Sequence, residues 1–322
     1  MHGWLGLLMA GAALAQAPQP NGGGVRPGTL PRRWLTGGPN CMEVPDWQVH
    51  EYNSDLYILR ESGCTNYEKP FLYLIFGESK AMLLDTGAGK TDVAHEVDGV
   101  ISKWLARNHR NSIPLIVAHS HSHSDHVAGD SQFRERPDTT VIPLTIEATQ
   151  KFFGIDRWPD GMGQVDLGGR AIDVFPIPGH NKLSLAYYDR QTGILFTGDT
   201  VYPGRLYVDD FPAFVHSIAR LVEFTRGKIV THLLGCHIEQ TATPYLDYPI
   251  GSMYQPDEHP LELGRGELLE LDELLRGMDQ SRRVAMPDFT VWPVDAKGWQ
   301  ELEAIEKATL EKQRQSMWGQ PK

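Results

Sequence analysis

The sequence predicts an α+β fold in which β-sheets lie between layers of helices. Short apolar runs separated by turn residues come first, as in 71–76 and 81–84 around a turn at 77–80, and they predict hairpins. Longer segments with helical spacing, at 91–108 and 211–226, are interleaved with the later strands. This order favours sheets sandwiched between helices over a doubly wound parallel sheet.

The regular pattern begins near residue 47, and each element follows from its period. Apolar residues such as Val93, Val97 and Trp104 recur at helical spacing, whereas β-branched and aromatic runs bounded by turn residues predict strands. Strands are predicted at 55–59, 71–76, 81–84, 113–118, 141–144, 185–188, 194–197, 229–234 and 289–293, and a hairpin at 164–178. Helices are predicted at 91–108, 127–134, 211–226, 261–278 and 298–314.

The ends of the chain differ from this central pattern. Residues 1–17 are apolar and without charged side chains, and they end in a small-x-small triplet, which predicts a cleaved signal peptide. Residues 18–46 are rich in Pro and Gly and predict a flexible linker. The main domain is expected at 47–260, and 261–322 is expected to be a C-terminal helical extension.

Export through such a signal predicts a periplasmic or secreted protein. Cys41 and Cys64 lie in loop-like sequence and could pair after export, although nothing in the sequence fixes their geometry. The net charge of −11 argues against a nucleic-acid partner, which needs a basic surface. No internal segment approaches the ~20 apolar residues of a membrane span. The expected partner is a small-molecule substrate, and the oligomeric state is left open.

Residues 121–126, His-Ser-His-Ser-Asp-His, place four metal-capable side chains directly after a buried strand pattern. Imidazoles and carboxylates suit zinc, and also manganese or iron. His121 and His123 alternate in an extended segment and therefore point the same way. If a turn and helix follow, Asp125 and His126 can reach a second ion about 3.5–4 Å from the first, as in many two-metal hydrolases. A surface His/Ser tract is the alternative, which the buried strand pattern disfavours.

Three further candidate ligands, His180, Asp199 and His237, each follow a later strand pattern. Functional side chains collect in such loops, and a preceding glycine, as in Gly-His and Gly-Asp, lets the backbone approach an ion closely. Cys236 stands beside His237 and is expected to be a small buried residue, with a soft metal ligand as the second interpretation.

Together these motifs resemble the metallo-β-lactamase superfamily over about residues 50–240. The resemblance implies a four-layer αββα sandwich with metals at one edge of two sheets, here followed by a short C-terminal extension. The matching motifs are Asp85-Thr86-Gly87, the HxHxDH motif at 121–126, Pro178-Gly179-His180, Gly198-Asp199 and His237. By resemblance, His121, His123 and His180 hold the first zinc, Asp125, His126 and His237 hold the second, Asp199 bridges both, and Asp85 orients ligands.

The ligand set predicts a binuclear zinc hydrolase, with two ions per chain, that uses a metal-bridging hydroxide to cleave a small ester, lactone or thioester. Metal binding can lower the pKa of water from ~16 to near 7. Asp125 is expected to orient the hydroxide and pass its proton to the leaving group. Tyr202, Arg205 and Tyr207 closely follow Asp199 and are the candidate donors to the developing oxyanion.

Three alternatives remain open at this point. β-Lactam hydrolysis would fit export, but zinc β-lactamases generally lack the bridging aspartate, so Asp199 places the chain nearer glyoxalase II and lactonases. The basic helical domain that glyoxalase II uses for glutathione is not found. A di-iron redox protein would need an electron-carrier domain, and the sequence has no Cys-x-x-Cys motif. A purely structural metal site would usually be a closed four-ligand one.

Overall fold

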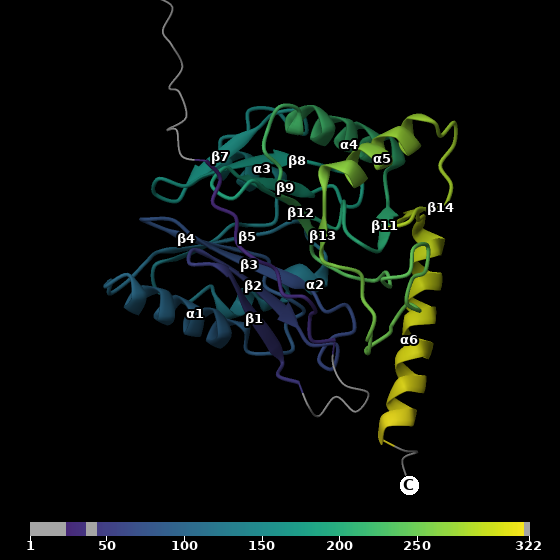
Figure 1. The fold of residues 1–322 in the computed structure, drawn as a ribbon, viewed down its shortest axis with the longest axis horizontal. Helices are drawn as coiled ribbons and strands as arrows, with labels where there is room; N and C mark the ends of the chain where they lie inside the picture. Colours follow the sequence, from purple (N-terminus) through teal and green to yellow (C-terminus); the bar gives the residue numbers. More distant parts are fainter. Residues whose placement is uncertain (1–23, 37–43, 319–322) are drawn as a thin grey trace, which may run out of the picture.

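Two mixed six-stranded sheets face each other at the centre of the molecule, and helices cover their outer faces (Figure 1). Helix α1 (Val93–Arg107) covers the first sheet, whereas α4 (Phe211–Thr225) and α5 (Arg265–Arg276) cover the second. The computed structural model describes residues 24–36 and 44–318. The predicted four-layer αββα sandwich is confirmed.

The first sheet is antiparallel up to its fourth strand and parallel beyond it. Its second and third strands are buried along their whole length, because one face meets the other sheet and the opposite face meets α1. In spatial order it contains β1 (Trp47–Asn53), β2 (Leu56–Glu61), β3 (Phe71–Phe76), β4 (Ala81–Leu84), β5 (Leu115–Ala118) and β6 (Thr139–Val141).

The second sheet is largely antiparallel, with one parallel pair between β10 and β12. A small third sheet ties the C-terminal segment to the domain through a parallel pair of β11 and β15. In spatial order the second sheet contains β13 (Glu262–Leu263), β12 (His232–Gly235), β10 (Ile194–Gly198), β9 (Leu185–Asp189), β8 (Ala171–Pro176) and β7 (Gly163–Asp166). The third contains β11 (Arg205–Val208), β15 (Thr290–Pro293) and β14 (Val284–Ala285).

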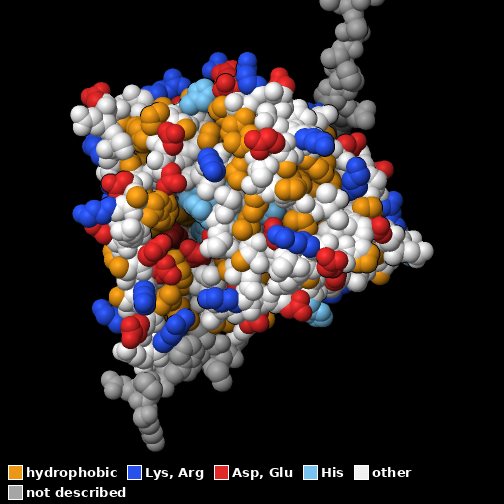
Figure 2. Space-filling model, turned by 180° about the vertical axis from the view of Figure 1, so that it is seen from behind, with side chains coloured by type: hydrophobic (Ala, Val, Ile, Leu, Met, Phe, Trp, Pro, Cys, Tyr) orange, Lys and Arg blue, Asp and Glu red, His pale blue; other side chains and the backbone are white. Residues whose placement is uncertain are grey.

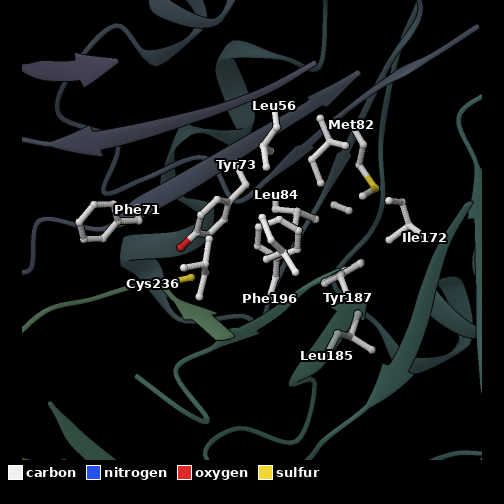
Figure 3. Close-up of a cluster of buried hydrophobic side chains, with 14 of the residues drawn as sticks. Leu56, Phe71, Tyr73, Met82, Leu84, Ile172, Leu185, Tyr187, Phe196 and Cys236 are labelled. Carbon is white, nitrogen blue, oxygen red and sulfur yellow. The ribbon is translucent and has the colours of Figure 1, made fainter. Parts of the chain in front are cut away.

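The main core lies between the two large sheets (Figure 3). Tyr73 of the first sheet and Phe196 of the second have ring centroids 4.6 Å apart, and both side chains are buried. Burying apolar area contributes roughly 25 cal/mol per Å², so this layer is the main source of fold stability. The Tyr73 hydroxyl donates a hydrogen bond to the Gly235 carbonyl, which satisfies its polar atom inside the core.

The predicted helices differ in detail from those observed. The helix expected at 127–134 is a short α2 (Ser124–Val127) continued by a 3-10 turn η1 (Ala128–Gln132), so the turn begins inside the metal motif. The segment 261–278 contributes β13 before α5 begins, and α3 (Ile146–Phe153) had not been predicted. The last helix, α6 (Ala296–Trp318), runs along the edge of the sandwich past both sheets (Figure 1).

Part of the predicted flexible linker, residues 24–36, contacts the domain before β1. In the described part, 24–36, Trp34 is buried against Phe71 with ring centroids 4.8 Å apart. Backbone hydrogen bonds join Thr29 to Tyr52 and Arg26 to Gln191. A large apolar side chain anchors this stretch despite its Pro/Gly composition. The predicted signal peptide at 1–17 and Cys41 of the predicted Cys41–Cys64 pair lie outside the described residues.

The C-terminal segment, expected to be a helical extension, packs against the main domain. Leu261 belongs to the inter-sheet core, and β13 extends the second sheet. Helix α5 packs on α4 through buried Leu268, Leu271 and Leu275. Among the described residues, no helix is long and apolar enough to cross a membrane.

Candidate metal centre

The predicted ligands come together where five strands end at one edge of the sandwich. His121 follows β5, His180 follows β8, Asp199 follows β10 and His237 follows β12. Asp85 follows β4 in the same layer as β5. Loops at strand ends present side chains from a rigid scaffold, which is why residues far apart in sequence can share one site.

Glycine is required at two of these turns. Gly179, directly before His180, has φ +144°, and a Cβ built there would lie 2.5 Å from the Phe214 Cα of α4. Gly198, directly before Asp199, has φ +53°, and its Cβ would lie 2.7 Å from the Ser120 Cβ. Both positions combine a left-handed backbone with close packing, which only glycine tolerates without strain.

The first group of ligands consists of His121, His123 and His180. His180 Nε2 lies 3.3 Å from His121 Nε2 and 3.1 Å from His123 Nδ1. Candidate ligand atoms, one from each residue, all lie within 4.8 Å of one another. Three converging imidazole nitrogens form a donor set typical of a zinc site that keeps a position open.

The second group consists of Asp125, His126 and His237, together with Asp199. His126 Nε2 is 2.9 Å and His237 Nε2 3.2 Å from Asp125 Oδ2, and the two imidazole nitrogens are 3.3 Å apart. Its candidate ligand atoms also lie within 4.8 Å of one another. The group thus combines two imidazoles with two carboxylates.

Asp199 lies between the two groups. Its Oδ2 is 3.7 Å from the Nε2 atoms of His121 and His180, 3.4 Å from that of His126 and 3.3 Å from that of His237. One carboxylate oxygen therefore faces ligands of both groups, as the bridging role expected for Asp199 requires.

Four of the histidines are oriented by a hydrogen bond at Nδ1, which turns Nε2 toward the centre. His180 Nδ1 lies 2.8 Å from the Tyr207 carbonyl, and His237 Nδ1 lies 2.9 Å from the Glu68 carbonyl. Carbonyl oxygens only accept, so both Nδ1 atoms donate, and both Nε2 atoms are left to face a metal ion. This arrangement is the one that metal-binding histidines need.

Asp85 and Ser120 orient the other two histidines, His126 and His121. Asp85 Oδ2 lies 3.0 Å from His126 Nδ1, and both Asp85 oxygens accept from Ser120, from its backbone N–H and its hydroxyl, at 2.7 Å. Ser120 Oγ also lies 3.0 Å from His121 Nδ1. Cys236 is buried beside this pair, with Sγ 3.4 Å from Asp85 Oδ2, so it fills the space behind the ligands.

Burial and mutual charge set the protonation of the cluster. Burial, followed by the charge of His180, lowers the pKa of His123 to about 4, so its imidazole is neutral at pH 7. Burial would raise the pKa of Asp199, but His237, His126 and His121 together hold it well below its usual value. Burial would lower the pKa of His126 and His237, but the charges of Asp125 and Asp199 raise both well above their usual value. A metal ion bound between these carboxylates would displace the protons that the two rings otherwise hold.

An unpaired atom supports the same conclusion. Asp199 Oδ1 is buried and has no hydrogen-bond partner among the described residues. An unsatisfied buried acceptor costs about 1–3 kcal/mol, and more when charged, so a cation at this place would remove a real penalty. Together with the imidazole and carboxylate donors, this atom shows that the residues fit divalent metal binding.

A pocket of about 440 Å³ opens onto both groups. In Figure 2, histidine side chains lie at the floor of a hollow with acidic side chains beside it. Its lining combines the ligands with aromatic and acidic residues and with one face of α6. The lining residues are Tyr67, Glu68, His123, Ser124, Asp125, His180, Asp199, Tyr202, Tyr207, His237, Glu239, Ile250, Trp299, Leu302, Glu303 and Glu306.

Helix α6 contributes four residues to the pocket lining, which the sequence did not predict. Trp299, Leu302, Glu303 and Glu306 recur at intervals of three and four residues and so share one helical face. The Trp299 ring lies 5.3 Å from that of Tyr207 and 6.1 Å from that of His123. The helical spacing of these residues predicts the helix but does not indicate that one face of the helix lines the pocket.

The three predicted oxyanion donors differ in their position and in their hydrogen bonds. Arg205 is buried outside the pocket lining, where it pairs with Glu239 at 3.0 Å, donates to the Tyr248 carbonyl at 2.7 Å and donates to the Tyr207 hydroxyl at 3.0 Å. Tyr202 lines the pocket, but its hydroxyl is hydrogen-bonded to Glu239 and to the Arg205 carbonyl. Tyr207 lines the pocket and accepts from Arg205, which leaves its own hydroxyl hydrogen to donate.

Comparison with known proteins places this geometry in a family. The model of the metallo-beta-lactamase superfamily matches residues 69–275. An acyl-coenzyme A thioesterase (MBLAC2) of Bos taurus is 24% identical over 236 residues, which cover 61% of this chain and 83% of that protein. A hydroxyacylglutathione hydrolase of Chelativorans sp. (strain BNC1) is 34% identical over 120 residues, 36% of this chain and 47% of that protein.

Solved structures also match the chain, at low sequence identity. A metallo-beta-lactamase from Pontibacter korlensis has a TM-score of 0.48 at 15% identity, covering 72% of this chain and 100% of that one. A superfamily protein from Sulfolobus tokodaii has a TM-score of 0.44 at 13% identity, covering 81% and 98%. With the family model matching well over half of its length, the chain belongs to the metallo-β-lactamase superfamily.

Proposed function

We propose that this chain is a binuclear zinc hydrolase that cleaves a thioester or a small ester. That it is a metal-binding hydrolase of the superfamily follows from the family match, the His/Asp groups and the hydrolase relatives. The two zinc ions and the substrate are the proposed part. The observation that carries them is Asp199, whose Oδ2 faces ligands of both groups.

The chemistry needs a nucleophile, a proton carrier and a donor to the oxyanion. Bound zinc ions would lower the pKa of a shared water to near 7, giving a bridging hydroxide, and would polarise the substrate carbonyl. Asp125 lines the pocket, and its carboxylate can hold a proton and pass it to the leaving group. Burial and the charge of Glu239 raise the pKa of Tyr207, which keeps its hydroxyl protonated as a donor to the oxyanion.

Thioester or ester cleavage is favoured over the alternative of β-lactam hydrolysis. Two kinds of curated relative are named for thioester substrates, one matched over most of its length and the other over about half. Asp199 in the bridging position also counts against a β-lactamase, as the ligand pattern indicated. Lactones share the reacting carbonyl and remain within the proposed ester class.

The proposal predicts about two zinc ions per chain in protein loaded with zinc and then desalted. Replacing Asp199 with Asn removes the shared anionic ligand, so we expect bound zinc to fall below two per chain and hydrolysis to fall at least about 100-fold. Elemental analysis and a panel of thioesters, esters, lactones and a chromogenic cephalosporin measure both. Unchanged hydrolysis in metal-free protein would contradict the proposal, and cephalosporin cleavage alone would favour the alternative.

We also propose that the protein is exported to the periplasm or secreted. The support is the uncharged apolar stretch within residues 1–17 and the small-x-small triplet that ends at Ala17. Expression of the full chain in a bacterial host should yield a mature protein that begins at Pro18 in the extracytoplasmic fraction. N-terminal sequencing measures this, and an intact Met1 in the cytoplasmic fraction would contradict it.

A further inference from the structure

The pocket wall that faces the ligand groups combines carboxylates with aromatic rings. Its acidic side chains outside the two ligand groups are Glu68, Glu239, Glu303 and Glu306, and its rings other than imidazoles are Tyr67, Tyr202, Tyr207 and Trp299. No Lys or Arg is among the described residues that line it. The described wall is therefore acidic and aromatic, without a Lys or Arg side chain to pair with an anion.

The four glutamates are not equivalent. Glu239 is paired with Arg205 at 3.0 Å, so its charge is compensated. Glu68 accepts a hydrogen bond from Tyr67 at 2.8 Å. Glu303 and Glu306 form no ion pair among the described residues, and the exposed Lys90 acts on Glu306 only from outside the lining. Burial raises the pKa of Glu68 to about 8, which leaves this carboxyl mostly protonated at pH 7. The uncompensated charge of the wall thus lies on α6, on Glu303 and on Glu306, although burial raises the pKa of Glu306.

Helix α6 sets these carboxylates at a fixed distance from the metal ligands. Trp299 contacts the ring of His123, whereas Glu306 lies two turns further along the same face, about 10 Å away at 1.5 Å per residue. Tyr67, whose hydroxyl interacts with Glu306, closes that far end. A substrate whose carbonyl lies at the ligands therefore extends its remote part along α6.

We propose that this pocket selects thioesters or esters whose remote part carries an ammonium group over those whose remote part is anionic. The inference rests on the proposed function and names its substrate class. Aromatic faces and carboxylates both attract a primary or quaternary ammonium. An anion at the same place would meet Glu303 and Glu306 without a compensating cation.

The selected reaction is an ordinary hydrolysis. Water adds to the acyl carbon, the carbon–sulfur or carbon–oxygen bond breaks, and the leaving thiol or alcohol takes up a proton, so no other reactant is needed. The proposed preference differs from the substrates that the relatives' names print. Coenzyme A carries phosphates, and glutathione has a net negative charge. Both would bring negative charge against the acidic wall.

The test uses acetyl thioesters of three small thiols that differ in charge: thiocholine, 2-mercaptoethanol and 3-mercaptopropionate. Released thiol is measured with a chromogenic disulfide on zinc-loaded full-length protein. We expect kcat/KM for the thiocholine ester to exceed that for the mercaptopropionate ester by at least about tenfold, mainly through KM. The ratio should shrink as salt rises, since ions screen partly exposed charges.

A double variant, Glu303→Gln with Glu306→Gln, assigns the selectivity to α6. We expect it to reduce the cation-to-anion ratio about fivefold or more. Glu301→Gln is the matched control, because Glu301 is exposed on the same helix, pairs with Lys297 and lies outside the lining. Glu301→Gln should leave the ratio of kcat/KM for the cationic ester to that for the anionic ester unchanged.

The outcomes separate the two proposals. Equal or faster hydrolysis of the anionic ester, or an unchanged ratio in the double variant, overturns the charge selectivity while leaving the hydrolase proposal standing. If none of the three esters is cleaved, thioester hydrolysis fails, and calorimetric titration with choline then decides the selectivity without turnover. Choline binding that the double variant loses would support it, and the absence of binding would overturn it.

Discussion

At the residue scale, the site depends on the partners behind the ligands as much as on the ligands themselves. Asp85, Ser120 and the carbonyls of Tyr207 and Glu68 fix the ring orientation of four histidines. The sequence motif gave the ligand types, and the resemblance assigned Asp85 its orienting role. Ser120 carried no such signal, because its role depends on contacts from two sides that no local pattern encodes.

Ser120→Ala tests this support. The change removes the hydroxyl shared by Asp85 and His121 but leaves the backbone N–H bond to Asp85. We expect zinc affinity to fall about 10- to 100-fold, the usual cost of losing such an outer partner. Competition with a fluorescent zinc chelator measures it, and Ser54→Ala, an exposed serine in a turn, is the control. Affinity equal to the parent protein's would show that Ser120 does not orient the ligands.

At the element scale, the strands were easier to predict than the surfaces that helices cover. β3 and β4 have the predicted bounds, because fully buried strands are continuous apolar runs. β1 and β11 were missed: Trp47–Asn53 has a mixed burial pattern, and Arg205–Val208 contains an ion-paired arginine that reads as loop sequence. Arg205 was therefore expected in the site, whereas the structure uses it to hold Glu239 and Tyr207.

Trp299→Ala tests the contribution of α6 to substrate binding. The indole contacts the rings of Tyr207 and His123, and its Nε1 donates to Asp209 at 2.6 Å. Removing it widens the pocket without removing a ligand, so we expect KM to rise about threefold to tenfold while zinc content stays the same. Steady-state kinetics and elemental analysis measure the two quantities, and Trp299→Phe should recover part of the effect. A loss of zinc with unchanged KM would contradict this role.

At the scale of the whole molecule, one buried arginine joins the two large sheets. Arg170, in the turn between β7 and β8, pairs with Asp189 of β9 and donates to the carbonyls of Asp55 and Phe76 at 2.7 and 2.9 Å. The sequence predicts a hairpin at 164–178 but not this contact, because the partners of Arg170 are up to 115 residues away. Pairing across that separation is a property of the assembled fold.

Arg170→Met should lower the free energy of unfolding by about 3–5 kcal/mol, since it leaves Asp189 buried without its cation. Urea denaturation followed by circular dichroism measures this. Adding Asp189→Asn removes the unpaired charge, so the double variant should regain part of the loss. A single variant as stable as the parent protein would show that the ion pair contributes nothing net to the joining of the sheets.

The placement of α6 has a consequence for how such a protein can change. The proposed metal ligands lie between His121 and His237, on loops fixed by the sandwich, whereas the pocket glutamates without an ion pair among the described residues that are proposed to select the substrate, Glu303 and Glu306, lie on α6. The residues proposed to carry out the hydrolysis and the charged residues proposed to select the substrate thus lie in separate stretches of the chain. Replacing α6 with another helix would therefore change the substrate preference while the candidate metal ligands stay in place. Natural variation or laboratory grafting could act on α6 in this way.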